Sequence, residues 1–208
     1  MTHAELISKY KDLAATSQFA AIWMSIMMQC NGWDISPPVV DPWTTSSQDD
    51  PSGQTNQIDT ANPVLFLSNT YDPVTPLRAA VKMALKFKGA GLLEQLSQGH
   101  CTLSTVSLCT AKVVREYVAS GKVPPPPTGV DGKFLEGEWM RCGVDEVPWG
   151  GLSAVKAASW AAEEREMAEG WRELQRVMPE VQRWGVGKAE GIDMKAVMAL
   201  ARGNEGGW

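Results

Sequence analysis

The sequence NPVLFLSNTYDPVTP, residues 62–76, decides the fold class of this chain. Its apolar run at 64–67 is short and continuous, which is typical of a strand buried on both faces of a parallel sheet. A turn that contains Asp72 follows this run. Thr75 is a favourable N-cap, and Pro76 suits the first position of a helix. The stretch therefore predicts a buried strand that leads through a turn into a helix.

The residues that follow extend this pattern into a βαβ unit. Apolar positions at helical spacing predict a helix from Leu77 to near Gly89, and a second strand is predicted over 91–96. A strand, a helix and a strand in this order favour two parallel strands. Another helix is predicted over 107–120, ended by Gly121 in the C′ position. The fold class is therefore α/β, a short parallel sheet with flanking helices.

The regions on either side of this unit differ from it in composition. Residues 3–30 are predicted to form one helix, and residues 34–62 an irregular surface loop that is rich in polar residues, Pro and Gly. From Gly151 the composition favours a helical tail, in which Ser153 caps a long helix and 194–202 form a second one. The long helix has an apolar stripe that is expected to pack on the rest of the protein: Trp160, Met167, Trp171, Leu174 and Met178.

Composition bounds the class of protein. With 208 residues, 44% of them hydrophobic, the chain can build one ordinary core. A net charge of −5 with scattered basic residues argues against a nucleic-acid partner. The best apolar run, Phe19–Met28, is too short to span a bilayer, so no membrane partner is expected. No signal-peptide cleavage site follows this run, and the compartment stays open.

The four cysteines are Cys30, Cys101, Cys109 and Cys142. None forms a Cys-x-x-Cys pair, so we expect neither a zinc site nor any other metal or cofactor. Four cysteines permit three pairings, among which the sequence does not choose. The simplest interpretation is four buried thiols, and the alternative is one disulfide among the last three.

Asp72 and His100 each lie directly after a predicted strand. Loops at the carboxyl ends of parallel strands converge over one crevice, where active sites gather. An acyl-transfer histidine takes a proton through one ring nitrogen, and a carboxylate holds the other. Asp before Pro is also a common turn former, and a Gly-His pair can be a plain loop. The order of acid and then histidine, each after a strand, favours a catalytic pair.

The stretch 62–80 resembles the acid-bearing strand and turn of tripeptidyl aminopeptidase-like (TAP-like) α/β-hydrolases. In that family an apolar strand runs into an Asp-Pro-Val-Thr-Pro turn and a helix. The likeness continues in the Gly-His loop at 98–101, the helix start of fungal members at 107–110, the Gly-x-Leu-Pro exit at 121–124 and a Cys-x-Gly-Trp element at 30–33. It extends over residues 16–149.

The resemblance implies the C-terminal part of a serine peptidase that releases short peptides from free N-termini, in a family often exported. It implies the acid role for Asp72 and the general-base role for His100. A peptide substrate is implied only where the missing N-terminal half is present.

It also implies four regions. Residues 1–40 resemble the end of the cap region, and 41–62 form a surface loop. Residues 63–150 are the TAP-like C-terminal region, and 151–208 are a helical tail of unknown role.

The sequence departs from the family in its nucleophile. The family serine stands in a Gly-x-Ser-x-Gly elbow before the acid, and these 208 residues contain no such elbow. Ser153 lacks the last glycine and comes after the histidine, so we interpret it as a helix cap. Cys101 adjoins His100, and neighbouring side chains usually point apart, so we do not assign it as a nucleophile. By the family route no acyl-enzyme forms from these residues alone.

Three functional hypotheses stay open. The chain is a piece of a serine hydrolase, or it is a non-catalytic remnant that acts as a binding protein, or its tail is a protein-binding appendage. A thin sheet with open edges also predicts possible self-association.

Overall fold

A computed structural model describes residues 2–29, 57–131, 136–147, 151–152 and 157–184. The chain divides into two compact units, Met1–Pro42 and Trp43–Trp208, each of which is described by itself. Within the described ranges, no helix has the length and apolar character that crossing a membrane requires.

The first unit contains two helices, α1 (His3–Thr16) and α2 (Ala20–Gln29). Thr2 and Glu5 form a capping box at the start of α1. The prediction of a single helix over 3–30 is wrong, because Ser17 leaves the helical conformation with φ −147° and ψ 131°. Its hydroxyl then accepts the N–H of Phe19 at 3.1 Å, which starts a new helix.

The second unit is built on a three-stranded sheet. Its strands are β1 (Leu65–Tyr71), β2 (Gly91–Gln98) and β3 (Met140–Cys142), in the order β1-β2-β3. All neighbours are parallel, which confirms the βαβ prediction. The third strand was not predicted, because its three residues show neither an apolar run nor an alternation long enough to read.

Two details of the first βα connection correct the sequence prediction. The strand β1 continues to Tyr71 through residues 69–71, which were expected in the turn. The helix α3 (Leu77–Lys86) has Pro76 as its N-cap residue, and the Thr75 side chain is not the cap. The Thr75 hydroxyl instead donates a hydrogen bond to Asp72 within the same turn, so it binds the candidate acid and does not cap the helix.

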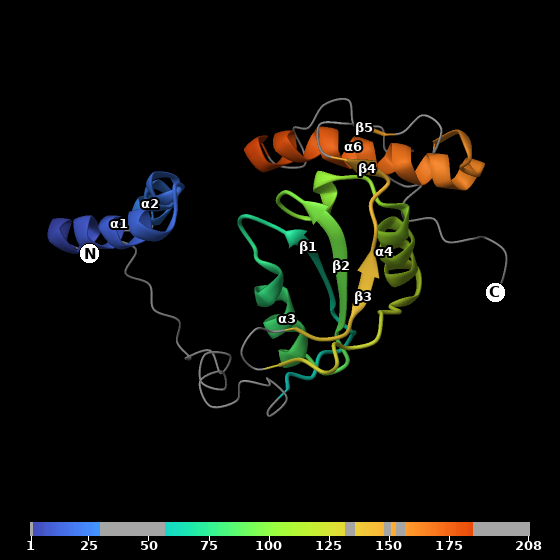
Figure 1. Cartoon of the computed structure of the whole chain (residues 1–208), viewed down its shortest axis with the longest axis horizontal. Coiled ribbons are helices and arrows are strands. Elements are labelled where there is room, and N and C mark those ends of the chain that lie inside the picture. The colour runs from blue at the N-terminus through green and yellow to red at the C-terminus, as the bar shows by residue number, and fades with distance from the viewer. Residues whose placement is uncertain (1, 30–56, 132–135, 148–150, 153–156, 185–208) are drawn as a thin grey trace. The chain divides into compact units, whose positions relative to one another are not determined.

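Helices cover both faces of the sheet (Figure 1). The helix α3 packs on one face through a cluster of buried residues that Phe66 adjoins: Val81, Ala84, Leu85 and Leu92. The helix α4 (Leu108–Ser120) lies on the other side of the sheet in Figure 1. Its N-cap is Ser107, and it ends at Gly121 with a left-handed φ of 73°, as the sequence predicted.

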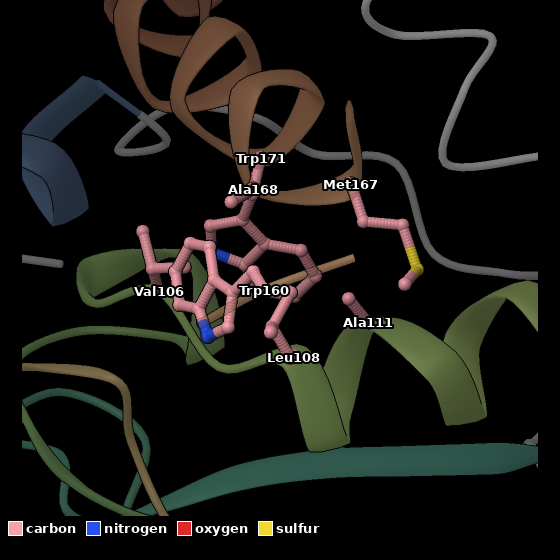
Figure 2. Close-up of a cluster of buried hydrophobic side chains, with 7 residues drawn as sticks. All are labelled: Val106, Leu108, Ala111, Trp160, Met167, Ala168 and Trp171. Atoms are coloured by element: carbon pink, nitrogen blue, oxygen red, sulfur yellow. The ribbon is translucent and has the colours of Figure 1, made fainter. Parts of the chain in front are cut away.

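The long C-terminal helix α6 (Ala162–Trp184) packs against α4. Figure 2 shows its side chains pointing toward those of the segment that begins α4; the buried cluster is Val106, Leu108, Ala111, Trp160, Met167, Ala168 and Trp171. The expected packing of this stripe on the body is therefore confirmed for Trp160, Met167 and Trp171, whereas Leu174 and Met178 are only half-buried.

The start of this helix differs from the prediction. It begins at Ala162, and Gly151–Leu152 forms a short strand, β5, that pairs with β4 (Glu146–Val147). Ser153 and residues 194–202, predicted as a helix cap and a helix, lie outside the described residues.

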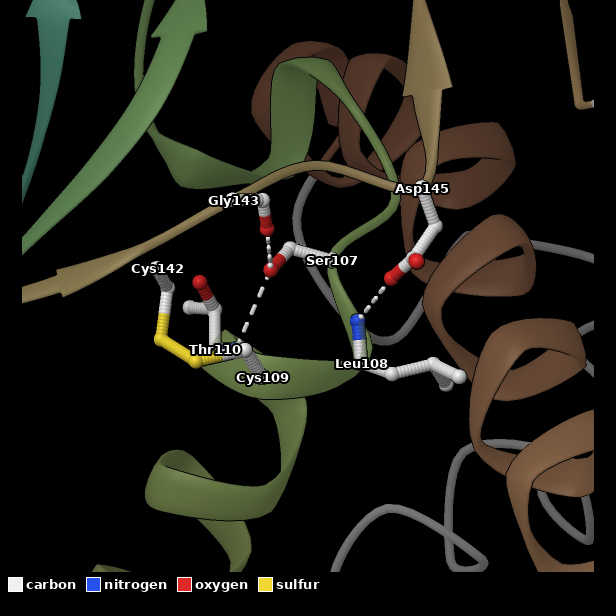
Figure 3. Close-up of a disulfide and its surroundings, with 7 residues drawn as sticks. All are labelled: Ser107, Leu108, Cys109, Thr110, Cys142, Gly143 and Asp145. Carbon is white, nitrogen blue, oxygen red and sulfur yellow. Dashed lines mark hydrogen bonds between the residues drawn. A yellow bond between two sulfur atoms is a disulfide. The ribbon is translucent and has the colours of Figure 1, made fainter.

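One disulfide joins the third strand to α4. Cys109 and Cys142 are bonded, as Figure 3 shows, with Cα atoms 5.5 Å apart. Cys101 is a free and exposed thiol, which corrects the expectation of a buried one. Cys30 lies outside the described residues.

Candidate active site

Asp72 and His100 lie at the carboxyl ends of the two longest strands of the sheet. Asp72 directly follows β1. His100 follows β2, and one glycine separates it from Gln98, the last residue of that strand. Because β1 and β2 are parallel and adjacent, their ends meet at the same edge of the sheet. This topology brings together two residues that are 28 positions apart.

The two side chains are in hydrogen-bond contact. The Nδ1 atom of His100 lies 3.1 Å from Oδ1 and 3.2 Å from Oδ2 of Asp72. The Asp72 side chain is 1% exposed, whereas that of His100 is 52% exposed. The pair therefore has a buried carboxylate at its base and an imidazole that reaches solvent.

Four further donors surround the Asp72 carboxylate. The backbone N–H groups of Val74 and Thr75 donate to Oδ1, and the Thr75 hydroxyl and the N–H of Cys101 donate to Oδ2, each at 2.8 Å. Burial raises the pKa of Asp72, but these hydrogen bonds outweigh it and hold the pKa well below its usual range. Asp72 is therefore a carboxylate at neutral pH.

The ionised acid fixes the tautomer of His100. A carboxylate only accepts hydrogen bonds, so Nδ1 carries a hydrogen, and in the neutral ring Nε2 then presents its lone pair. Within the described part of the chain, no group hydrogen-bonds to Nε2. An imidazole in this state can take a proton at Nε2 while its other nitrogen is held by the acid.

Two buried amides anchor the segment that follows β2, Asn69 beside His100 and Gln95 farther along the chain. Asn69, on β1, donates from Nδ2 to the backbone oxygens of Gly99 and Cys101 at 2.9 and 2.7 Å. Gln95, on β2, donates from Nε2 to the backbone oxygen of Thr102 at 3.0 Å. Neither residue was predicted from the sequence, although an amide on a strand expected to be buried is a signal that a buried partner exists.

The residue after the histidine has an unusual backbone. Cys101 has φ 59° and ψ 162°, a conformation that residues other than glycine rarely adopt. Its N–H donates to Asp72 and its carbonyl accepts from Asn69, so both sides of this residue are fixed. The described residues contain no group of three or more side chains that could hold a metal ion.

A pocket of about 590 Å³ lies between the start of α3 and the strands β2 and β3; it is lined by Leu77, Arg78, Glu94, Glu136, Gly137, Glu138, Trp139 and Arg141. The buried carboxylate of Glu94 forms part of its wall. Oε2 of Glu94 accepts from Trp139 Nε1 at 2.8 Å and Arg141 Nε at 2.9 Å, and Oε1 accepts from the Thr70 hydroxyl at 2.8 Å. This network ties the short strand β3 to the two longer strands.

A family model described as TAP-like protein matches residues 16–130, which is more than half of the chain. A search of curated proteins and a search of solved structures found no match.

Proposed function

Because this chain belongs to the TAP-like family of α/β-hydrolases, we propose that Asp72 and His100 are the acid and the general base of a Ser-His-Asp triad. The contact between Nδ1 of His100 and the buried carboxylate of Asp72 is the observation that carries this proposal. The substrate class that we propose is the free N-terminus of a peptide, from which short peptides are released.

The proposed steps follow from the state of the imidazole. Nε2 of His100 takes the proton from a serine hydroxyl as that oxygen attacks the scissile carbonyl. The positive charge that develops on the ring is stabilised by the ionised Asp72, which stays deprotonated. Nε2 then returns the proton to the leaving amine, and a second cycle with water releases the acyl group.

We propose that the serine lies outside these 208 residues, because the sequence holds no Gly-x-Ser-x-Gly elbow. The oxyanion hole, which the family builds from an earlier loop, is proposed to lie outside them as well. The 208-residue chain by itself is then inactive. In this proposal it supplies two members of a triad to a larger hydrolase.

The test begins with the gene. The reading frame that precedes Met1 is translated and searched for a strand, a Gly-x-Ser-x-Gly turn and a helix. If they are present, the extended chain is assayed with a chromogenic tripeptide substrate. We expect turnover that falls by roughly 10⁴-fold in Asp72→Asn and to a similar residual level in His100→Ala. Turnover that survives His100→Ala would contradict the assigned roles.

The 208-residue chain is assayed beside it. We expect no hydrolysis of the tripeptide and no labelling by a fluorophosphonate, which reacts with activated serines. Hydrolysis by this chain that His100→Ala abolishes would show that a nucleophile is present among the 208 residues, against the proposal.

A second candidate function is a non-catalytic remnant that binds another chain. It is favoured by the edge strand β1, which pairs only with β2 in the described part of the chain and exposes Tyr71 to 69%. Pairing through this edge predicts concentration-dependent self-association in light scattering. Replacement of the exposed Leu67 by lysine (Leu67→Lys) is expected to suppress this self-association. Val118→Lys on α4 is the matched surface control, which should leave it unchanged. A monomer at all concentrations argues against this candidate.

A further inference from the structure

The turn that carries His100 is anchored by one buried side chain on the neighbouring strand. Asn69 is fully buried on β1, and its Nδ2 atom lies 2.9 Å from the backbone oxygen of Gly99 and 2.7 Å from that of Cys101. These two carbonyls belong to the residues on either side of His100. A third contact joins the same nitrogen to the Ser104 hydroxyl at 3.0 Å.

The orientation of the Asn69 amide follows from its partners. Two backbone carbonyls only accept hydrogen bonds, so the NH₂ end must face them. The carbonyl end, Oδ1, is buried without a hydrogen-bond partner among the described residues. An unpartnered buried acceptor costs stability, and a small apolar residue at this position would avoid that cost. The presence of an asparagine at this position therefore indicates that its NH₂ group has a role that offsets this cost in stability.

The two hydrogen bonds from Asn69 to the carbonyls of Gly99 and Cys101, called the clamp below, hold a strained backbone conformation in place. Cys101 has a positive φ, and such backbone persists only where the surroundings determine it from more than one side. Asn69 and the backbone N–H of Ser104 hold its carbonyl, at 2.7 and 3.1 Å, and Asp72 holds its N–H. Loss of the Asn69 amide would remove this donor from the Gly99 carbonyl and leave the Cys101 carbonyl to the Ser104 N–H, so His100 would be free to shift away from Asp72.

We propose that Asn69 is a positioning residue, which keeps Nδ1 of His100 on the carboxylate of Asp72 by clamping the carbonyls on both sides of the histidine. The inference rests on the proposed function, in which this contact sets the tautomer of the base. Asn69 itself touches no reacting atom.

Gln95 supplies a matched control. It is the register partner of Asn69 on β2, and it is also fully buried. Its amide anchors Thr102 and Thr105, at the far end of the turn, and makes no hydrogen bond to the residues next to His100. Gln95→Ala therefore removes a comparable buried amide without opening the clamp.

The experiment is NMR of the His100 ring, assigned separately from that of His3, in the 208-residue chain at neutral pH. Long-range ¹H–¹⁵N spectra distinguish a protonated from an unprotonated ring nitrogen. We expect one dominant tautomer with hydrogen on Nδ1 in the wild-type chain and in Gln95→Ala. In Asn69→Ala we expect that preference to be lost, with averaged shifts at both ring nitrogens.

The outcomes separate the two proposals. If the wild-type chain lacks the Nδ1–H tautomer, the acid–base pair of the proposed function fails. If the wild-type chain has it and Asn69→Ala keeps it, only the positioning role of Asn69 fails. Equal loss in Asn69→Ala and Gln95→Ala would also overturn the inference, because the effect would then be general loosening of the turn.

A measurement on the wild-type chain covers the case in which Asn69→Ala does not fold. The Nδ2 hydrogens of Asn69 should exchange slowly with solvent and show through-hydrogen-bond couplings to the carbonyl carbons of Gly99 and Cys101. Fast exchange, at the rate of an exposed side-chain amide, would mean that the clamp does not exist.

Discussion

The backbone N–H of Cys101 donates to Oδ2 of Asp72 at 2.8 Å, so the same carboxylate binds both His100 and the residue that follows it. Asp72 therefore joins the two turns through hydrogen bonds and is also the proposed acid. The turn after β1 contributes the N–H groups of Val74 and Thr75, and the turn after β2 contributes that of Cys101. Loss of the negative charge should therefore affect stability and the site together.

The ionisation of Asp72 predicts how stability depends on pH. The pKa of Asp72 is below its unfolded value of about 3.9, so folding favours the ionised form. Its contribution is fully present above that unfolded value and is lost as the pH falls further, through the lowered folded pKa. Urea unfolding at a series of pH values between neutrality and 3 should show this loss.

Replacement of the same residue gives the control. In Asp72→Asn the acid-dependent loss should be smaller, and stability at neutral pH should fall by about 2 kcal/mol, because an NH₂ group then faces at least one backbone donor. Asp59→Asn changes an exposed aspartate in a surface pair with Lys88 and should leave both quantities nearly unchanged. A parallel pH profile in the wild-type chain and Asp72→Asn would contradict the prediction.

The disulfide predicts a large stability difference between oxidised and reduced chains. Cys109 and Cys142 are separated by 33 positions, and closure of a loop of that length in the unfolded state is worth about 3 to 4 kcal/mol. We expect Cys142→Ser to lose about this amount in urea unfolding under non-reducing conditions. Cys101→Ser, at the free and exposed thiol, should change stability by less than about 0.5 kcal/mol. Equal effects of the two variants would argue that the bond does not constrain the chain.

The buried Glu94 network predicts a graded response. Glu94→Ala leaves the Trp139 indole and the Arg141 guanidinium without their acceptor and should cost about 3 kcal/mol. Glu94→Gln keeps an oxygen for both donors, and the Thr70 hydroxyl can turn to accept from the new NH₂ group, so about 1 kcal/mol is expected.

Thermal or urea unfolding measures both values. The control is Glu116→Gln, in an exposed pair with Lys122, which should be nearly neutral. If Glu94→Gln costs as much as Glu94→Ala, then the negative charge, and not the acceptor atoms, holds the network.

The packing of α6 predicts that its aromatic stripe stabilises the α/β body. Trp171 is buried against the start of α4, and Trp171→Ala should cost about 3 to 5 kcal/mol through the lost contacts and the cavity. Val118→Ala removes an exposed side chain from α4 and should cost less than about 0.5 kcal/mol. A cost below about 1 kcal/mol for Trp171→Ala would show that α6 is only loosely attached.

The interpretation of the sequence succeeded where local pattern decides structure. The apolar run at 64–67 and the helical spacing after Leu77 predicted a strand, a helix and a parallel strand, and these form. It failed where the hydrogen bond of a single side chain decides. Ser17 divides the predicted first helix, and the Thr75 hydroxyl bonds to Asp72 and does not cap a helix.

The sequence by itself determined the α/β class and the order of acid and histidine after consecutive strands, because strand and helix periodicity and turn residues are local properties of the chain. Three features depend on packing between distant segments: Cys109 pairs with Cys142, β3 completes the sheet, and Asn69 holds the carbonyls on both sides of His100. Each of these contacts joins residues about thirty or more positions apart. Such contacts depend on how the layers pack, and no local spacing encodes that packing.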